Sequence, residues 1–309
     1  MDLYKKPPLT HKKQLQLLIS RGLKVSDFNK ALHLIDKIGY FRLSGYLYPQ
    51  LELPKNEHRF KPESYLESSF KMYCFDRDLR ILLMGNIEKI EVALRSKLTY
   101  YLSLRYDAFW YKHDKLFKDI SKQENGKLSI QKSQNDSKED FVIQYKRNYA
   151  NNDMPSWMVM EIVTFSHLSI TYSNLKDTSI KSKISNDFGI PYPLFENWLL
   201  VLTYTRNICA HHSRFWNRDL AIKGLKSTKQ LPFKWIDQNG IARNKSYFYL
   251  SIVKYLLDRI NPNNSFKENI KNLFIKYPNI DYIKSMNFPE DWENQPLWMD
   301  HELSLIDLE

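Results

Sequence analysis

The segment RNICAHHSRFWNR, residues 206–218, gathers side chains that could perform acid–base chemistry on a phosphate. It holds two adjacent histidines, from a chain with 8 in all, together with three arginines. An unpaired charge is costly to bury, so a protein core has little use for such a cluster. The segment is therefore either the solvated end of a helix or a site that handles phosphate.

A helix through this segment would place Asn207 and His211 on one face, because they are four residues apart. Arg206 lies one position round the helix, and its long side chain still reaches the same point. An imidazole exchanges a proton near neutral pH, and a guanidinium offers a planar fork to two phosphate oxygens. Together they could cleave RNA without a metal, the imidazole withdrawing the proton of a ribose 2′-hydroxyl. DNA lacks that hydroxyl and would not be cut.

The chain beyond the two histidines remains basic and contains aromatic residues. Its cations, the candidate ligands of an RNA backbone, are Arg214, Arg218, Lys223, Lys226, Lys229 and Lys234, against one acidic residue, Asp219. Phe215, Trp216 and Trp235 lie among them and are candidates for stacking on bases. The alternative is a helix C-terminus whose dipole favours cations, with the aromatic rings in the core. Spacing and charge alone leave both interpretations open.

Composition narrows the class of protein. Of the 309 residues, 43% are apolar, which supports a core and excludes wholesale disorder. The net charge of +11 favours a polyanionic partner such as nucleic acid, although an AT-rich coding sequence would also enrich lysine. Cys74 and Cys209 form no C-x-x-C pair, so we expect neither a metal nor a cofactor. No signal peptide or membrane span is recognisable, and we expect a cytoplasmic protein without membrane contact.

Apolar residues recur at helical spacing and no segment alternates convincingly as a strand, so the sequence predicts an all-α fold. Residues 1–55 are expected to form a small N-terminal helical unit, with helices beginning after Thr10 and near Ser26. Residues 56–309 are expected to form a larger helical domain. Its longest helix should cover 64–106, with Arg80, Glu91, Arg95 and other charges on a solvated face.

Further helices are expected over 157–175, from Leu194 into the 206–218 segment, and over 247–260. His167, inside the first of these, is interpreted as a core residue rather than a metal ligand. The polar stretch 118–139 is expected to be a mobile loop. The C-terminal extension contains NFPEDWENQPLW, residues 287–298, which should dock as an extended segment on the body of the protein.

The segment RNICAHHSRFWNR also resembles the signature of the Abi-like (AbiD/AbiF) abortive-infection proteins, a branch of the HEPN superfamily. The resemblance continues, in matching order, through KPPLTHKKQLQLLISRGL, GYFRLSGYLYPQL, DRDLRILLMGNIEKIEVALRSKL and FPEDW. It implies a HEPN-like helical bundle and a metal-independent endoribonuclease with the motif R-polar-x-x-x-H. By position, Arg206, Asn207 and His211 would be its catalytic residues, and His212 a supporting or alternative catalytic neighbour.

The resemblance further implies a homodimer, because active HEPN sites form where two copies of the motif meet. Relatives of this kind are toxins in phage defence or toxin–antitoxin systems, some restrained by a small noncoding antitoxin RNA. We therefore expect an RNA-cleaving toxin. A non-catalytic module that binds or senses RNA is the alternative, and a protein-interaction factor whose motif only caps a helix is a third. The intact arginine, asparagine and histidine favour catalysis, because binding alone requires no titratable group between cations.

Overall fold

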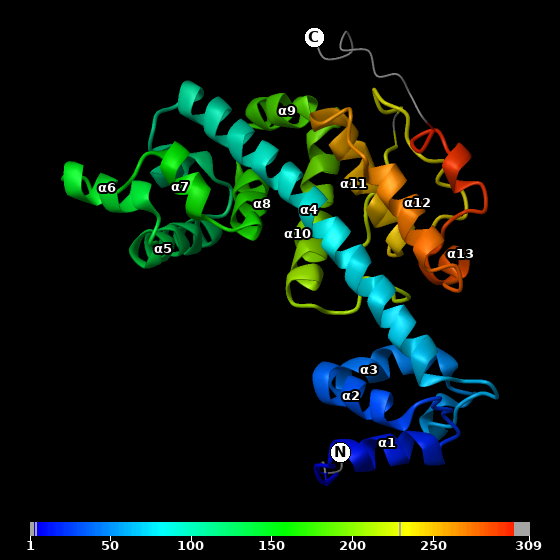
Figure 1. Ribbon diagram of the computed structural model, residues 1–309. Coiled ribbons are helices and arrows are strands. Elements are labelled where there is room, and N and C mark those ends of the chain that lie inside the picture. Colours follow the sequence, from blue (N-terminus) through cyan, green and yellow to red (C-terminus); the bar gives the residue numbers. More distant parts are fainter. Residues whose placement is uncertain (1–2, 4, 229, 300–309) are drawn as a thin grey trace. The chain divides into compact units, whose positions relative to one another are not determined.

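The computed structural model of the chain describes residues 3, 5–228 and 230–299 (Figure 1). These residues form α-helices and short 3-10 turns, with isolated β-bridges and no β-strand among them. The all-α prediction is therefore confirmed. No helix in the described part of the chain combines the length and the apolar character needed to cross a membrane.

The chain divides into two compact units, Met1–Arg80 with Asn272–Ile280, and Ile81–Lys271 with Asp281–Glu309. Two helices continue through the division, α4 (Leu66–Arg105) and α12 (Phe266–Lys276). The first compact unit therefore extends beyond residue 55, where the sequence analysis ended the N-terminal unit. Helix α4 is continuous, which confirms the single long helix expected over 64–106.

The first unit begins with α1 (His11–Ser20), α2 (Phe28–Ile38) and α3 (Tyr40–Leu47), packed in order. Thr10 caps α1 as expected, its side chain accepting from the Lys13 N–H. The cap of α2 is Asp27 rather than Ser26, because the Asp27 carboxylate accepts from the Lys30 N–H at 2.9 Å. Leucines and isoleucines of these helices form the core of this unit.

A buried polar network ties α3 to α4. The Tyr46 hydroxyl donates to Asp76 at 2.6 Å, and Arg80 donates to the Tyr46 hydroxyl at 3.2 Å and pairs with Asp76. Burial raises the pKa of Tyr46, and the neighbouring Asp76 carboxylate adds to the shift. A solvated position for Arg80 was therefore a wrong prediction. The Asp76 carboxylate, one turn earlier on the same helix, and the Tyr46 oxygen, 34 residues away in sequence, compensate the desolvation of Arg80.

Among its described residues, the second unit contains the rest of α4 and nine further helices that lie wholly or partly within it. They are α5 (Ile120–Asp136), α6 (Asp140–Asn148), α7 (Ser156–Ile162), α8 (Phe165–Asn174), α9 (Thr178–Asp187), α10 (Tyr192–Ala210), α11 (Ser246–Ile260), α12 and α13 (Tyr282–Met286). The described part of the chain also forms 3-10 turns at Tyr48–Gln50, Lys55–Glu57, Trp110–Lys112, Asp114–Leu116 and Trp292–Asn294. Helix α10 packs against α8, α9 and α11, which makes it central to this unit.

The stretch 118–139 is not a loop. It forms α5, capped by Asp119, which accepts from the Lys122 N–H. Many of its residues are straight-chain glutamines and lysines, which have good helix propensity. Its buried positions include Gln123, which donates to the Tyr111 carbonyl and so anchors the helix. Because this buried residue is polar, the apolar pattern of the helix is weak.

The expected helix over 157–175 is two helices, because the chain leaves α7 at Val163 and re-enters at α8 with Thr164 as the cap. Arg95 is buried here, donating to Glu91 at 2.8 Å and to the Val163 carbonyl at 3.2 Å. Its predicted solvated position is therefore also wrong. Burial lowers the pKa of His167 to about 4, which keeps this histidine neutral and agrees with a structural role.

Residues 287–298 dock within the second unit as predicted, but they form turns, including the 3-10 turn Trp292–Asn294, rather than an extended segment. Phe288, Trp292 and Trp298 are buried, and the Trp298 indole donates to Ser251 of α11 at 3.4 Å. The Phe288 ring lies 4.7 Å from that of Tyr247. Aromatic burial thus fixes this segment against α11.

We expect Asp76→Ala to lower the free energy of unfolding by about 3–5 kcal/mol, because it leaves the Arg80 charge buried without its partner. Urea denaturation followed by circular dichroism measures the change. The exposed Lys71 on the same helix provides the control, and Lys71→Ala should change the value by no more than about 0.5 kcal/mol. Equal stability of the two variants would contradict the account of the network.

Candidate functional site at the end of helix α10

Helix α10 carries the Arg206–His211 segment and is held on several sides. Pro191 precedes it and a second proline, Pro193, lies in its first turn, where a missing N–H costs nothing. Many of its apolar residues, including Trp198, Leu199 and Leu202, are fully buried. The buried Lys181 of α9 pairs with Glu196 of α10, and burial lowers the pKa of this lysine. The first half of α10, which precedes the motif, is therefore anchored in the core of this unit.

The two histidines have different backbone conformations. Helix α10 ends at Ala210, and His211 follows as the C-cap with φ −86° and ψ 8°. His212 is left-handed, with φ 55°. The Ser213 N–H donates to the Ile208 carbonyl at 2.9 Å and the His212 N–H to the Cys209 carbonyl at 3.0 Å, the paired bonds of a Schellman motif. His212 thus occupies a position that glycine usually holds.

Arg206, Asn207 and His211 all lie at this helix end. Arg206 Nη1 donates to Asn207 Oδ1 at 3.4 Å, and the His211 N–H donates to the Asn207 carbonyl at 3.0 Å. The four-residue relation that the spacing predicts is present, although His211 lies one residue beyond the helix. Arg206 and Asn207 are half-buried and His211 is exposed. A guanidinium, an amide and an imidazole are therefore available together at the surface.

The arginines and lysines that follow the motif differ in their burial. The Arg218 guanidinium is half-buried and braces the loop, donating to the Arg214 carbonyl at 3.0 Å and to the Tyr204 hydroxyl at 3.5 Å. Arg214 is also half-buried. Lys223, Lys226 and Lys234 are exposed, and Lys226 Nζ donates to the Gln238 carbonyl at 2.9 Å. Lys229 lies outside the described residues.

Of the aromatic residues in this tract, Phe215 and Trp216 are core residues, which favours the interpretation that places these rings in the core over the one that stacks them on bases. Phe215 and Trp216 are buried, and the Trp216 indole donates to Ser285 at 2.8 Å. The half-buried Trp235 ring lies 4.9 Å from that of Trp198. Burial of Phe215 and Trp216 removes these two rings from water and from any RNA.

Side chains of α10 that sequence reasoning missed hold the loop after the motif. The Tyr204 hydroxyl accepts from the Ala221 N–H at 3.3 Å. Asn197 accepts from the Leu225 N–H at 2.6 Å and donates to the Lys223 carbonyl at 3.3 Å. Their helical spacing of seven residues along α10 is the one signal that could have identified them.

Glycine is required where this loop approaches α11. A Cβ atom at Gly224 would meet the Phe248 ring at 2.4 Å. The close approach fixes the backbone next to Lys223, so this exposed cation extends from an ordered chain.

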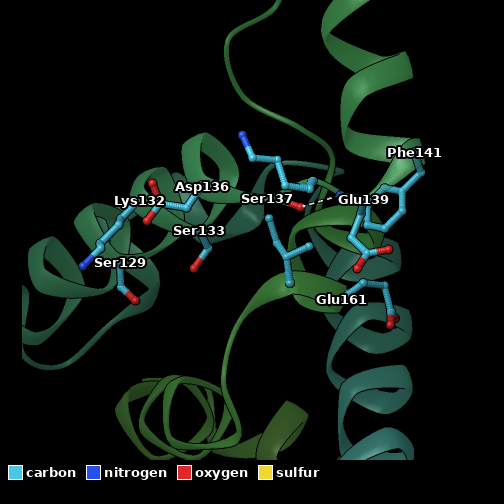
Figure 2. Close-up of a pocket in the computed structure, with 10 residues that line it drawn as sticks. Ser129, Lys132, Ser133, Asp136, Ser137, Glu139, Phe141 and Glu161 are labelled. Atoms are coloured by element: carbon cyan, nitrogen blue, oxygen red, sulfur yellow. Dashed lines mark hydrogen bonds between the residues drawn. The ribbon is translucent and has the colours of Figure 1, made fainter.

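A polar cavity of about 750 Å³ lies apart from the motif, and no residue of 206–218 lines it (Figure 2). Figure 2 shows Ser129, Lys132 and Asp136 of α5 opposite Glu161 of α7. The carboxylates in this lining disfavour a phosphate ligand. Across the described residues, no cluster of three or more His, Cys, Asp or Glu side chains is arranged to hold a metal ion.

The left-handed conformation of His212 predicts that His212→Gly will be more stable than His212→Ala by about 1 kcal/mol. Both substitutions remove the imidazole, but only glycine adopts this conformation without steric cost. Chemical denaturation of the two variants measures the difference directly. Equal stability, or a more stable alanine variant, would show that the Schellman turn does not constrain this residue.

Comparison with known proteins supplies the family. The search of curated proteins gave no significant match, and neither did the search of solved structures. A family profile described as Abi-like protein matches residues 33–217, from within α2 to just beyond the motif. The match covers more than half of the chain and includes Arg206, Asn207 and His211. This chain belongs to the Abi-like protein family.

Proposed function

We propose that this protein is a metal-independent endoribonuclease of the HEPN type, the toxin of a bacterial abortive-infection or toxin–antitoxin system. The observation that carries the proposal is the placement of Arg206, Asn207 and His211 at the C-terminal end of α10, where His211 is exposed. Membership of the Abi-like family supports the role in abortive infection. Its substrate is cellular or phage RNA in the cytoplasm.

The proposed reaction is attack of a ribose 2′-hydroxyl on the adjacent phosphorus. The His211 imidazole accepts the hydroxyl proton, and the Arg206 guanidinium stabilises charge that develops on the phosphate oxygens. The bond from phosphorus to the 5′-oxygen breaks, and that oxygen takes up a proton as it leaves. The products are a 2′,3′-cyclic phosphate and a 5′-hydroxyl. Asn207 accepts from Arg206 at 3.4 Å and so orients the guanidinium.

The leaving oxygen needs a proton donor, whereas one motif supplies one His211. A second copy of the chain, related by a two-fold axis, would bring a second imidazole to a shared site. We therefore propose a homodimer as the active form. His212 is the alternative second proton carrier, although its position in the Schellman turn favours a supporting role.

The exposed lysines beyond the motif are proposed to hold the RNA backbone. Lys223 and Lys226 extend from the loop that α10 holds, and Arg214 and Arg218 add positive charge at its base. The same face would serve a noncoding antitoxin RNA, because both ligands present phosphates. If the motif were inactive, this face would still support the alternative function, a non-catalytic module that binds or senses RNA.

Arg206→Ala and His211→Ala should each reduce RNA cleavage by at least about 100-fold, because each removes a group used in the chemical step. Binding of RNA should change little. Lys223→Ala with Lys226→Ala should instead weaken binding and flatten its dependence on salt, since these lysines contact phosphates. Denaturing gels in EDTA measure cleavage, and filter binding over a salt series measures affinity.

His33→Ala, which removes an exposed histidine of α2, is the matched control and should cleave as the wild type does. Full cleavage by His211→Ala would contradict the assignment of His211 as the catalytic histidine. If only His212→Ala lost cleavage, His212 would be the catalytic histidine instead. Sedimentation of the same wild-type sample tests the shared site: a monomer with full activity would exclude it.

A further inference from the structure

A second cavity, of about 570 Å³, lies where α6, the first turn of α7 and the turn after α4 meet. Its volume is within the range of about 300–1,000 Å³ that is usual for small-molecule sites. Five aromatic side chains are among the residues that line it: Phe109, Phe141, Tyr145, Tyr149 and Trp157. All its lining residues lie in the second compact unit.

Two of these rings are presented to solvent. Trp157 is 52% exposed and Tyr149 is 61% exposed. Tyr149 stacks on the Tyr145 ring, with centroids 4.9 Å apart and planes at 26°. Tyr145 is held in turn by its hydroxyl, which donates to the Asp153 carbonyl at 2.8 Å. The Tyr149 ring therefore packs on Tyr145 through one face, and its exposed surface is available to stack on a planar ligand.

Uncharged amides complete the lining. Gln144, Asn148 and Asn151 are exposed at the cavity, and no residue that lines it carries a formal charge. An amide both donates and accepts, which matches the mixed edge of a nucleobase. The neighbouring polar cavity shares Phe141 but presents Glu139 and Glu161 (Figure 2). Three carboxylates outnumber the two lysines in that polar cavity and disfavour a nucleotide phosphate there.

Cations lie beside the aromatic cavity in the last turn of α6. Lys146 and Arg147 are both exposed, and Lys146 Nζ donates to the Gln134 carbonyl at 2.6 Å. A base in the cavity would therefore have positive charge nearby for its phosphates. Aromatic rings that stack bases, beside cations that track the backbone, are the usual elements of single-strand binding.

We propose that this cavity binds an unpaired nucleobase of single-stranded RNA, stacked on Tyr149 and Trp157 and hydrogen-bonded by the amides. The proposal rests on the RNA-directed function above, but it concerns a site outside the α10 motif. The base belongs to a nucleotide that is held, not cut. Such a site would select RNA whose bases are unpaired, since a base inside a duplex cannot enter the cavity.

The test measures binding of a fluorescent 2′-O-methyl hexanucleotide to the full chain by anisotropy. This probe has no free 2′-hydroxyl, so it remains intact whichever residue is catalytic. Tyr149→Ala and Trp157→Ala should each weaken binding by about 5- to 150-fold, the range that base–aromatic stacking spans. Tyr149→Phe and Trp157→Phe, which keep a ring, should stay close to the wild type.

The matched control is Tyr100→Ala, which removes a tyrosine of α4 that is 58% exposed and does not line the cavity. It should bind as the wild type does. A hexanucleotide of abasic residues should bind weakly to the wild type and show no further loss with either alanine variant. Unchanged melting temperatures would show that the truncations leave the fold intact.

Equal affinity of Tyr149→Ala, Trp157→Ala and wild type would overturn the proposal. An equal loss of affinity with the abasic probe would also overturn it, because the contact would then be to the RNA backbone. A protein ligand that occupies the cavity without displacing RNA would overturn it as well. Cleavage of unmodified RNA is read separately. Intact base-dependent binding without any cleavage would contradict the nuclease and leave this inference standing.

Discussion

The left-handed turn at His212 is the backbone constraint on which the candidate site depends. It ends α10 directly after the motif, so His211 remains at the surface while the chain reverses. Phe215 and Trp216 can then enter the core only a few residues later. If α10 continued through this segment, the histidines and the aromatic rings would all lie on one continuous helix. The turn therefore separates the reactive side chain from the packing side chains.

The loop after the turn owes its order to the same helix. Asn197 and Tyr204 hold its backbone, and the Trp198 indole donates to the Leu225 carbonyl at 3.2 Å. Gly224 lets it lie close to α11. Groups that act on a phosphate are most effective when they are positioned before the substrate arrives. Helix α10 thus supplies both the motif and the support for the cations beyond it.

The local sequence pattern was sufficient to predict much of this fold. It was insufficient where a side chain's partners are distant in sequence. Helical spacing identified α10 and the relation of Asn207 to His211, and Thr10 marked the start of α1. It missed α5 because buried glutamines replace apolar residues there, leaving little periodicity. Burial of Arg95 depends on the Val163 carbonyl, 68 residues away in sequence, which no local pattern contains. The inward rings of Phe215 and Trp216 likewise follow from the turn at His212, which their own sequence does not reveal.

The central claim is that the 2′-hydroxyl of the RNA is the nucleophile. The most direct measurement compares an all-ribose oligonucleotide with one that carries a single 2′-deoxy residue at the mapped cleavage position, both in EDTA. The account predicts 2′,3′-cyclic phosphate and 5′-hydroxyl ends from the first and no cleavage at the deoxy position of the second. Cleavage at the deoxy position, or 3′-hydroxyl and 5′-phosphate ends, would contradict it.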